Sequence, residues 1–152
     1  MTPLIPSDEA IPLQDAINQL LRPLIGDFMA ETAAIVENGS NRTDVYSTIV
    51  HNDGNSSRNT GVRVDNVAAV VDCYEILTTE ALHAAYQRIG AVKSLQRTDR
   101  PAPQDGDVHM TTSIIVARDS GLTLEDIASE MSRLNATVPS HRWPDMVAVL
   151  SK

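Results

Sequence analysis

At 152 residues, the chain has the length of a single domain that buries its own hydrophobic core. Its aromatic content of 3% argues against a surface that stacks the bases of single-stranded nucleic acid, and its formal charge of −8 argues against a broadly basic, phosphate-binding surface. One cysteine rules out an internal disulfide, and the lack of a signal peptide or a long apolar run predicts a cytoplasmic protein without a membrane span.

The N-terminal quarter divides into an arm and a predicted helix. Residues 1–12 carry three prolines and are expected to form an extended arm ahead of a single domain over residues 13–152. From Leu13 to Val36, apolar residues recur at helical spacing, which predicts a helix that Pro23 kinks or divides in two. The turn-forming run NGSN at residues 38–41 ends this helix.

Three predicted strands follow. β-branched residues mark residues 44–50 and, more briefly, residues 61–64. The third and longest strand, VAAVVDCYEIL at residues 67–77, is apolar until Asp72 interrupts it. Burying a carboxylate without a partner is costly, so Asp72 requires either a hydrogen-bonding neighbour or a function.

The second half of the chain alternates helices and strands. Thr78 opens a helix expected over about residues 79–96, and a strand at residues 110–117 comes next. The run TLED at residues 123–126 has the form of a capping box that starts a second helix, and residues 146–150 form a last strand. The side chains that this second helix is expected to bury are Leu124, Ile127, Ala128, Met131 and Leu134.

This order of elements predicts an α/β (α+β) domain of three layers, in which helices flank a mixed central sheet. Two passages run from strand to helix to strand, and each should be a right-handed crossover that places its strands in parallel. No segment repeats at a fixed period. A single layered domain is therefore the expected architecture.

Two residues of the long strand and one of the following helix are candidates for chemistry. Asp72 and Tyr74 are two residues apart and share a face of the strand, with Cys73 on the other face. Lys93 falls inside the apolar stripe of the helix, so it should face the sheet and could pair with Asp72 or with a substrate phosphate. The basic residues Arg88, Lys93, Arg97 and Arg100 are clustered in the sequence, so any nucleic-acid contact would be local to this cluster or be bridged by a metal.

These elements carry a resemblance to a known superfamily. The run VAAVVDCYEILTTEALHAAYQRIGAVKSL at residues 67–95, followed by the closing WPDMVAVL, resembles the core of PD-(D/E)XK nuclease domains. It is most similar to an uncharacterised bacterial family in which an apolar strand ends in Glu-x-Lys and leads into a helix. The resemblance covers roughly residue 44 to the C-terminus and implies a restriction-endonuclease-like core.

The superfamily's catalytic pattern is an Asp on one strand and Asp/Glu-x-Lys on the next. The acids hold a divalent cation that activates water for phosphodiester hydrolysis. The resemblance implies that Asp44 is the first acid and Asp72 the second, and that together they would hold Mg²⁺. Tyr74 stands where the superfamily has lysine, and its neutral hydroxyl cannot supply a positive charge. Lys93 would then have to supply that charge from the helix.

Each candidate also has a purely structural alternative. Asp72 could be bound by a neighbouring strand end or by Arg63, and Asp44 could simply begin a strand. Lys93 could extend past the end of its helix into solvent. The arginines could form a solvated helix end that complements the helix dipole.

Three functions stay open on the sequence alone. The first is a degenerate nuclease-like domain that acts as a binding or regulatory module, in a bacterial defence or DNA-transaction system, with a protein partner or by self-association. The second is an active, magnesium-dependent nuclease. The third is the N-terminal domain of a larger protein whose activity lies elsewhere. The departure at Tyr74 and the acidic charge favour the first of these.

Overall fold

The computed structural model describes residues 12–24, 28–52, 62–97 and 111–151, without the side chains of residues 24, 29, 31–34 and 44–46. The expected arm therefore lies outside the described residues, except for Pro12. No helix in the described ranges is long and apolar enough to cross a membrane. The elements in chain order are α2 (Leu13–Leu21), η1 (Arg22–Leu24), β1 (Met29–Glu37), β2 (Arg42–His51), β3 (Val62–Arg63), η2 (Val64–Asn66), β4 (Val67–Leu77), α3 (Thr79–Lys93), β5 (Thr112–Ser120), α4 (Leu124–Asn135), η3 (Ser140–Arg142) and β6 (Met146–Val149).

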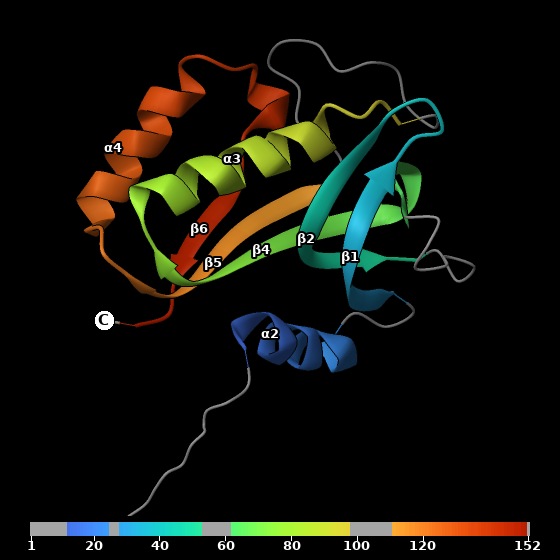
Figure 1. Cartoon of the computed structure of the whole chain (residues 1–152), viewed down its shortest axis with the longest axis horizontal. Helices are drawn as coiled ribbons and strands as arrows, with labels where there is room; N and C mark the ends of the chain where they lie inside the picture. The colour runs from blue at the N-terminus through green and yellow to red at the C-terminus, as the bar shows by residue number, and fades with distance from the viewer. Residues whose placement is uncertain (1–11, 25–27, 53–61, 98–110, 152) are drawn as a thin grey trace, which may run out of the picture.

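The strands form one mixed sheet between two layers of helices (Figure 1). In the described part of the chain its order is β3–β1–β2–β4–β5–β6. β2 runs antiparallel to both β1 and β4, whereas β4, β5 and β6 are parallel neighbours. The expected parallel placement through α3 and α4 is confirmed. Figure 1 shows these two helices on one face of the sheet and α2 on the other, which confirms the predicted three-layer α/β class.

The stretch expected to complete the first helix is instead a strand. α2 ends at Leu21, and Pro23 lies in the short 3₁₀ turn that follows. Residues 29–37 then pair with β2 along most of their length and with β3 at their end. The prediction of a helix up to Val36 is wrong because pairing on both sides, with Ala30 and Val36 buried, outweighs the helical preference of an alanine-rich run.

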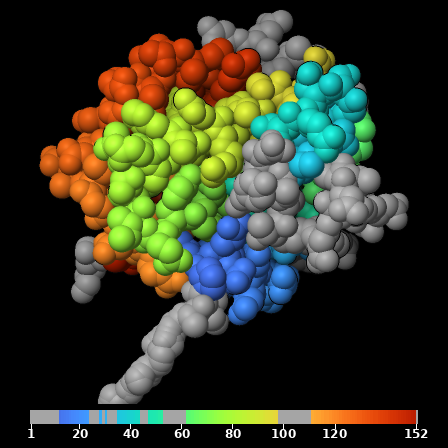
Figure 2. Space-filling view, viewed as in Figure 1, coloured from blue at the N-terminus to red at the C-terminus, as the bar shows by residue number. Residues whose placement is uncertain are grey.

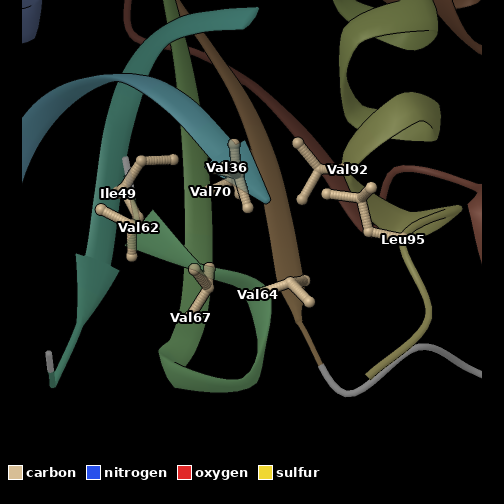
Figure 3. Packing of buried hydrophobic residues seen from close by; sticks show 8 residues of the cluster. All are labelled: Val36, Ile49, Val62, Val64, Val67, Val70, Val92 and Leu95. Carbon is tan, nitrogen blue, oxygen red and sulfur yellow. The ribbon is translucent and has the colours of Figure 1, made fainter. Parts of the chain in front are cut away.

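The face under α3 and α4 holds most of the hydrophobic core. Thr78 caps α3, since its side chain accepts a hydrogen bond from the backbone N–H of Ala81 at 3.1 Å, as the sequence predicted. Figure 2 shows α3 and α4 side by side on this face. Where α3 ends, one apolar cluster joins it to β1, β2, β3 and β4 (Figure 3). Its members are Val36, Ile49, Val62, Val64, Val67, Val70, Val92 and Leu95.

α2 covers the opposite face of the sheet. Its buried Leu13 packs with Val71 of β4 and Val116 of β5, and the backbone N–H of Leu13 donates to Glu75 at 2.8 Å. Cys73 packs on this α2 face, whereas Tyr74 packs with the core under α3, so the predicted alternation along β4 is confirmed. Burial, reinforced by the charges of Asp72 and Glu75, raises the pKa of Cys73 to about 12 and keeps the thiol protonated.

α4 begins as predicted but buries less than predicted. Thr123 and Asp126 form both bonds of the capping box. Of the five side chains expected inside, only Ile127 is buried. Leu124 is 76% exposed, so its predicted burial is wrong. The reason is its position at the first turn, which precedes the part of α4 that contacts the sheet through Ile127 and Met131.

A polar contact joins α3 to α4 at the surface and predicts a loss of stability in acid. Glu130 interacts with His83 of α3 and with Arg133 of its own helix. Hydrogen bonds from Arg133 and then from His83 lower the pKa of Glu130 from 4.5 to about 2. Because the folded pKa is depressed, this stabilising contribution is present above pH 4.5 and is lost as the pH falls towards 2. The free energies of unfolding of the wild type and of Glu130→Gln, measured with urea, should therefore converge as the pH falls through this range. A difference that stays constant with pH would contradict the stabilising role assigned to Glu130.

Candidate functional site

Asp72 lies in the middle of β4 and is the centre of a buried hydrogen-bond cluster. Its side chain is 2% exposed. Ser47 Oγ donates to Asp72 Oδ1 at 2.9 Å, and the hydroxyl of Tyr74 donates to Oδ2 at 2.9 Å. Arg88 Nη1 lies 2.9 Å from Oδ1 and 2.8 Å from Oδ2. The carboxylate therefore has both a cationic partner and two hydroxyl donors, as a buried charge requires.

Three elements bring these side chains together. Ser47 lies on β2, whose antiparallel register pairs Thr48 with Val71 and so places Ser47 beside Asp72. Tyr74 follows Asp72 by two residues and shares its face of β4. Arg88 comes from the third turn of α3, which lies over this face of the sheet, and its side chain is 29% exposed. The structural alternative in which Arg63 binds Asp72 is wrong, because Arg63 lies near Glu37 and Asp65.

The charges in this cluster balance locally. The guanidinium of Arg88 neutralises Asp72. Burial acts to lower the pKa of Arg88, but the nearby charge of Asp72 acts in the other direction, and the pKa is raised. Burial, followed by the charge of Asp72 and the hydrogen bond to it, raises the pKa of Tyr74 to about 12. Tyr74 is thus a neutral donor at physiological pH. Arg88 is therefore the cationic partner of Asp72 within the protein.

Lys93 takes part in a different cluster. It is buried, and its ammonium donates to Asp145 Oδ2 at 2.9 Å and to the carbonyl of Trp143 at 2.7 Å. Asp145 Oδ2 also accepts hydrogen bonds from the backbone N–H of Ser113 at 2.8 Å and from its hydroxyl at 3.2 Å. Lys93 does pair with a carboxylate, but with Asp145 instead of Asp72. It lies five residues beyond Arg88, which is roughly 7.5 Å further along the helix axis. The alternative in which Lys93 extends into solvent is also wrong, because the residue is 3% exposed.

Asp44 lies on β2, where its backbone pairs with Ile35, and its side chain is outside the described residues. Along β2 it is three residues from Ser47, or roughly 10 Å of strand. The side chain that β2 presents to Asp72 is therefore a serine. No three histidine, cysteine, aspartate or glutamate side chains gather into a metal site within the described residues. A metal role for Asp44 and Asp72 stays a prediction.

The arginines expected at a nucleic-acid interface make internal bonds where they are described. Arg88 holds Asp72 and also lies 3.1 Å from the hydroxyl of Tyr74. Arg97 donates to the carbonyl of Asp65 at 2.6 Å and to that of Val67 at 3.2 Å. Arg100 lies outside the described residues. Contact between these arginines and nucleic acid stays a prediction.

The comparisons with known proteins identify the fold. No family model and no curated protein matches the chain. Solved structures do match it, among them NucC from E. coli MS115-1 in a cAAA-bound form (TM-score 0.68, 16% identity) and an apo form (TM-score 0.66, 16% identity). NucC from P. aeruginosa ATCC27853, also cAAA-bound, matches with a TM-score of 0.65 and 15% identity. The fold is restriction-endonuclease-like.

The match to NucC covers most of this chain but a smaller share of each NucC chain. Each alignment covers 90% of this chain, so it includes nearly the whole described sheet and its helices. It covers 62%, 66% and 62% of the respective NucC chains, so this chain spans about two thirds of their length or less. The similarity therefore establishes a shared scaffold with NucC, on which the chemistry must be argued from this chain's own residues.

Proposed function

We propose that this chain is a nuclease-like domain related to bacterial defence that has lost metal-dependent cleavage and acts as a binding or regulatory module. The observation that carries the proposal is the state of Asp72. Its two oxygens are engaged by Ser47, Tyr74 and Arg88, and its charge is neutralised within the protein. The NucC-like fold supports the connection with defence.

The residues around Asp72 support the loss of catalysis. Mg²⁺ needs oxygen ligands in an octahedral arrangement, and the strand neighbour of Asp72 is a serine in place of a second acid. The guanidinium of Arg88, 2.8 Å from the carboxylate, would repel a divalent cation placed there. Tyr74 supplies no positive charge, and Arg88 supplies one but cannot accept a proton from water.

The second candidate, an active magnesium-dependent nuclease, is favoured by the location of the acids. Asp72 and Tyr74, which the resemblance matches with the superfamily's Asp/Glu-x-Lys, lie on the strand that leads into α3, within a fold similar to that of NucC. Asp44 is also on the neighbouring strand β2. The third candidate, a domain of a larger protein whose activity lies elsewhere, is compatible with the partial coverage of NucC.

Calorimetric titration with Mg²⁺ and Mn²⁺ separates the first two functions. We expect no saturable binding to the wild type and no nicking of supercoiled DNA or cleavage of RNA with either ion. Asp72→Asn is the matched control, because it removes the acid and keeps the side-chain volume. Metal binding by the wild type that Asp72→Asn abolishes, or cleavage with the same dependence, would show that the domain is a nuclease.

A regulatory module also needs a ligand, and the comparisons provide a first compound to test. Two of the matched NucC structures hold cAAA. Titration of the chain with cAAA, in the absence of any metal, tests binding separately from cleavage. Saturable binding of cAAA without cleavage would support the regulatory form of the proposal.

A further inference from the structure

The outer edge of β6, a strand of four residues, carries no charged residue and no proline. β6 is the last strand of the sheet, with β5 on one side and no strand on the other in the described part of the chain. Residues 146–150, MVAVL, contain no charge, proline or glycine. Met146 is 56% exposed and Leu150 is 59% exposed. Native edge strands are normally protected by charges, prolines, bulges or short length, because an open edge recruits another strand.

The direction of the backbone groups on β6 follows from its pairing with β5. The N–H of Leu150 donates to the carbonyl of Ala117 at 2.9 Å, so Leu150 faces β5. Because successive residues of a strand face opposite edges, Val147 and Val149 direct their N–H and C=O groups away from β5. At the opposite end of the sheet, β3 is only two residues long and carries Arg63. Among the described strands, the two edges of the sheet are thus unequal, and β6 offers the longer edge for pairing with another strand.

We propose that the β6 edge pairs with the β6 edge of a second copy of this chain. The pairing is antiparallel about a twofold axis at Ala148, so that Val147 of each copy lies opposite Val149 of the other. Each of these two residue pairs exchanges two backbone hydrogen bonds. Met146 of each copy then lies opposite Leu150 of the other, so the two most exposed apolar side chains of the edge cover each other.

The inference rests on the binding role proposed above and names the partner and the surface. A second copy is the occupant that the edge favours, because MVAVL is complementary to itself in the antiparallel direction. Two copies with a formal charge of −8 each repel one another, but the edge itself is uncharged. Added salt should therefore strengthen the pairing by screening the repulsion. A contact of this size, well below a standard interface, predicts a dissociation constant of roughly micromolar or weaker.

Sedimentation velocity over a series of protein concentrations tests the pairing. We expect the wild type to pass from monomer to dimer within about 1–500 µM, and at lower concentration in higher salt. Met146→Lys/Leu150→Lys places like charges opposite each other across the edge and should weaken the dimer about tenfold or more. Leu20→Lys is the matched control, because Leu20 is 62% exposed on α2, away from this edge, and its replacement should leave the dimer unchanged.

Two further measurements complete the test. An equimolar mixture of the lysine variant with Met146→Glu/Leu150→Glu should form mixed dimers, since opposite charges then face each other. In the unmodified chain, hydrogen exchange at the amides of Val147 and Val149 should slow as the protein concentration rises. A wild type that stays monomeric, a dimer that the lysine variant retains, or a dimer that Leu20→Lys also abolishes would overturn the inference. None of these outcomes bears on metal binding, so the proposed loss of cleavage is judged separately.

Discussion

Arg88→Met is expected to lower the free energy of unfolding by about 3 kcal/mol. The substitution keeps the packing length of the side chain but leaves Asp72, which is 2% exposed, without its cationic partner. Breaking a buried ion pair on one side is costly because the remaining charge is desolvated. Ser47 and Tyr74 still donate to the carboxylate, and Arg88 itself is partly solvated, which places the effect at the low end of the usual range. Urea unfolding at neutral pH measures it.

The reverse substitution provides the control for Arg88. Asp72→Asn leaves Arg88 with a partly solvated charge. It should therefore lower the free energy of unfolding by about 1–2 kcal/mol, which is less than the loss expected for Arg88→Met. The double variant should lose less stability than the sum of the single variants. Equal losses for the two single variants, or losses that simply add in the double variant, would show that Arg88 contributes packing alone.

Asp145→Ala is expected to be comparably destabilising, again by about 3 kcal/mol. Lys93 is 2% exposed at its side chain, and Asp145 is the carboxylate that compensates its charge. Without it, the ammonium keeps only the carbonyl of Trp143, and the backbone N–H of Ser113 loses its acceptor. As a result, the C-terminal end of α3 should separate more readily from the N-terminal ends of β5 and β6. The fluorescence of Trp143, the single tryptophan of the chain, reports unfolding from within this cluster.

Lys93→Met is the matched control for Asp145→Ala. Asp145 is 44% exposed at its side chain, so water can solvate its carboxylate once the lysine is gone. The apolar stem of methionine fills the space of the lysine stem, and the loss should be about 1–2 kcal/mol. If Lys93→Met proved as destabilising as Asp145→Ala, the argument from unequal exposure would be wrong.

Much of the fold could be predicted because the hydrophobic pattern and the capping residues agree locally. β4 occupies the predicted residues 67–77, and Thr78 and Thr123 cap the helices that they were expected to cap. The strand β1 could not be predicted in this way. Its alanines satisfy a helical pattern as well as a strand pattern, and only long-range pairing with β2 and β3 decides between them.

The candidate site was predicted only in part, for a reason that lies in the geometry of helices. The strand period fixed Asp72 and Tyr74 on one face, and the structure confirms that they touch. The helical wheel placed Lys93 on the sheet-facing stripe, which is correct, but a wheel gives the angle around a helix and not the partner along the sheet. Arg88 lies beside that stripe, and its reach to Asp72 depends on how α3 crosses β4. The contact of Ser47 with Asp72 could not be predicted from the sequence, because it depends on the register of β2 against β4.

The enclosure of Lys93 has a practical consequence for amine chemistry on this protein. The chain contains two lysines, Lys93 and Lys152. Acylating reagents should modify Lys93 only while the end of α3 is detached from Asp145 and Trp143, because its amine is otherwise bonded and inaccessible. The rate at which a peptide containing Lys93 becomes acylated would therefore report how fast the end of α3 detaches from Asp145 and Trp143.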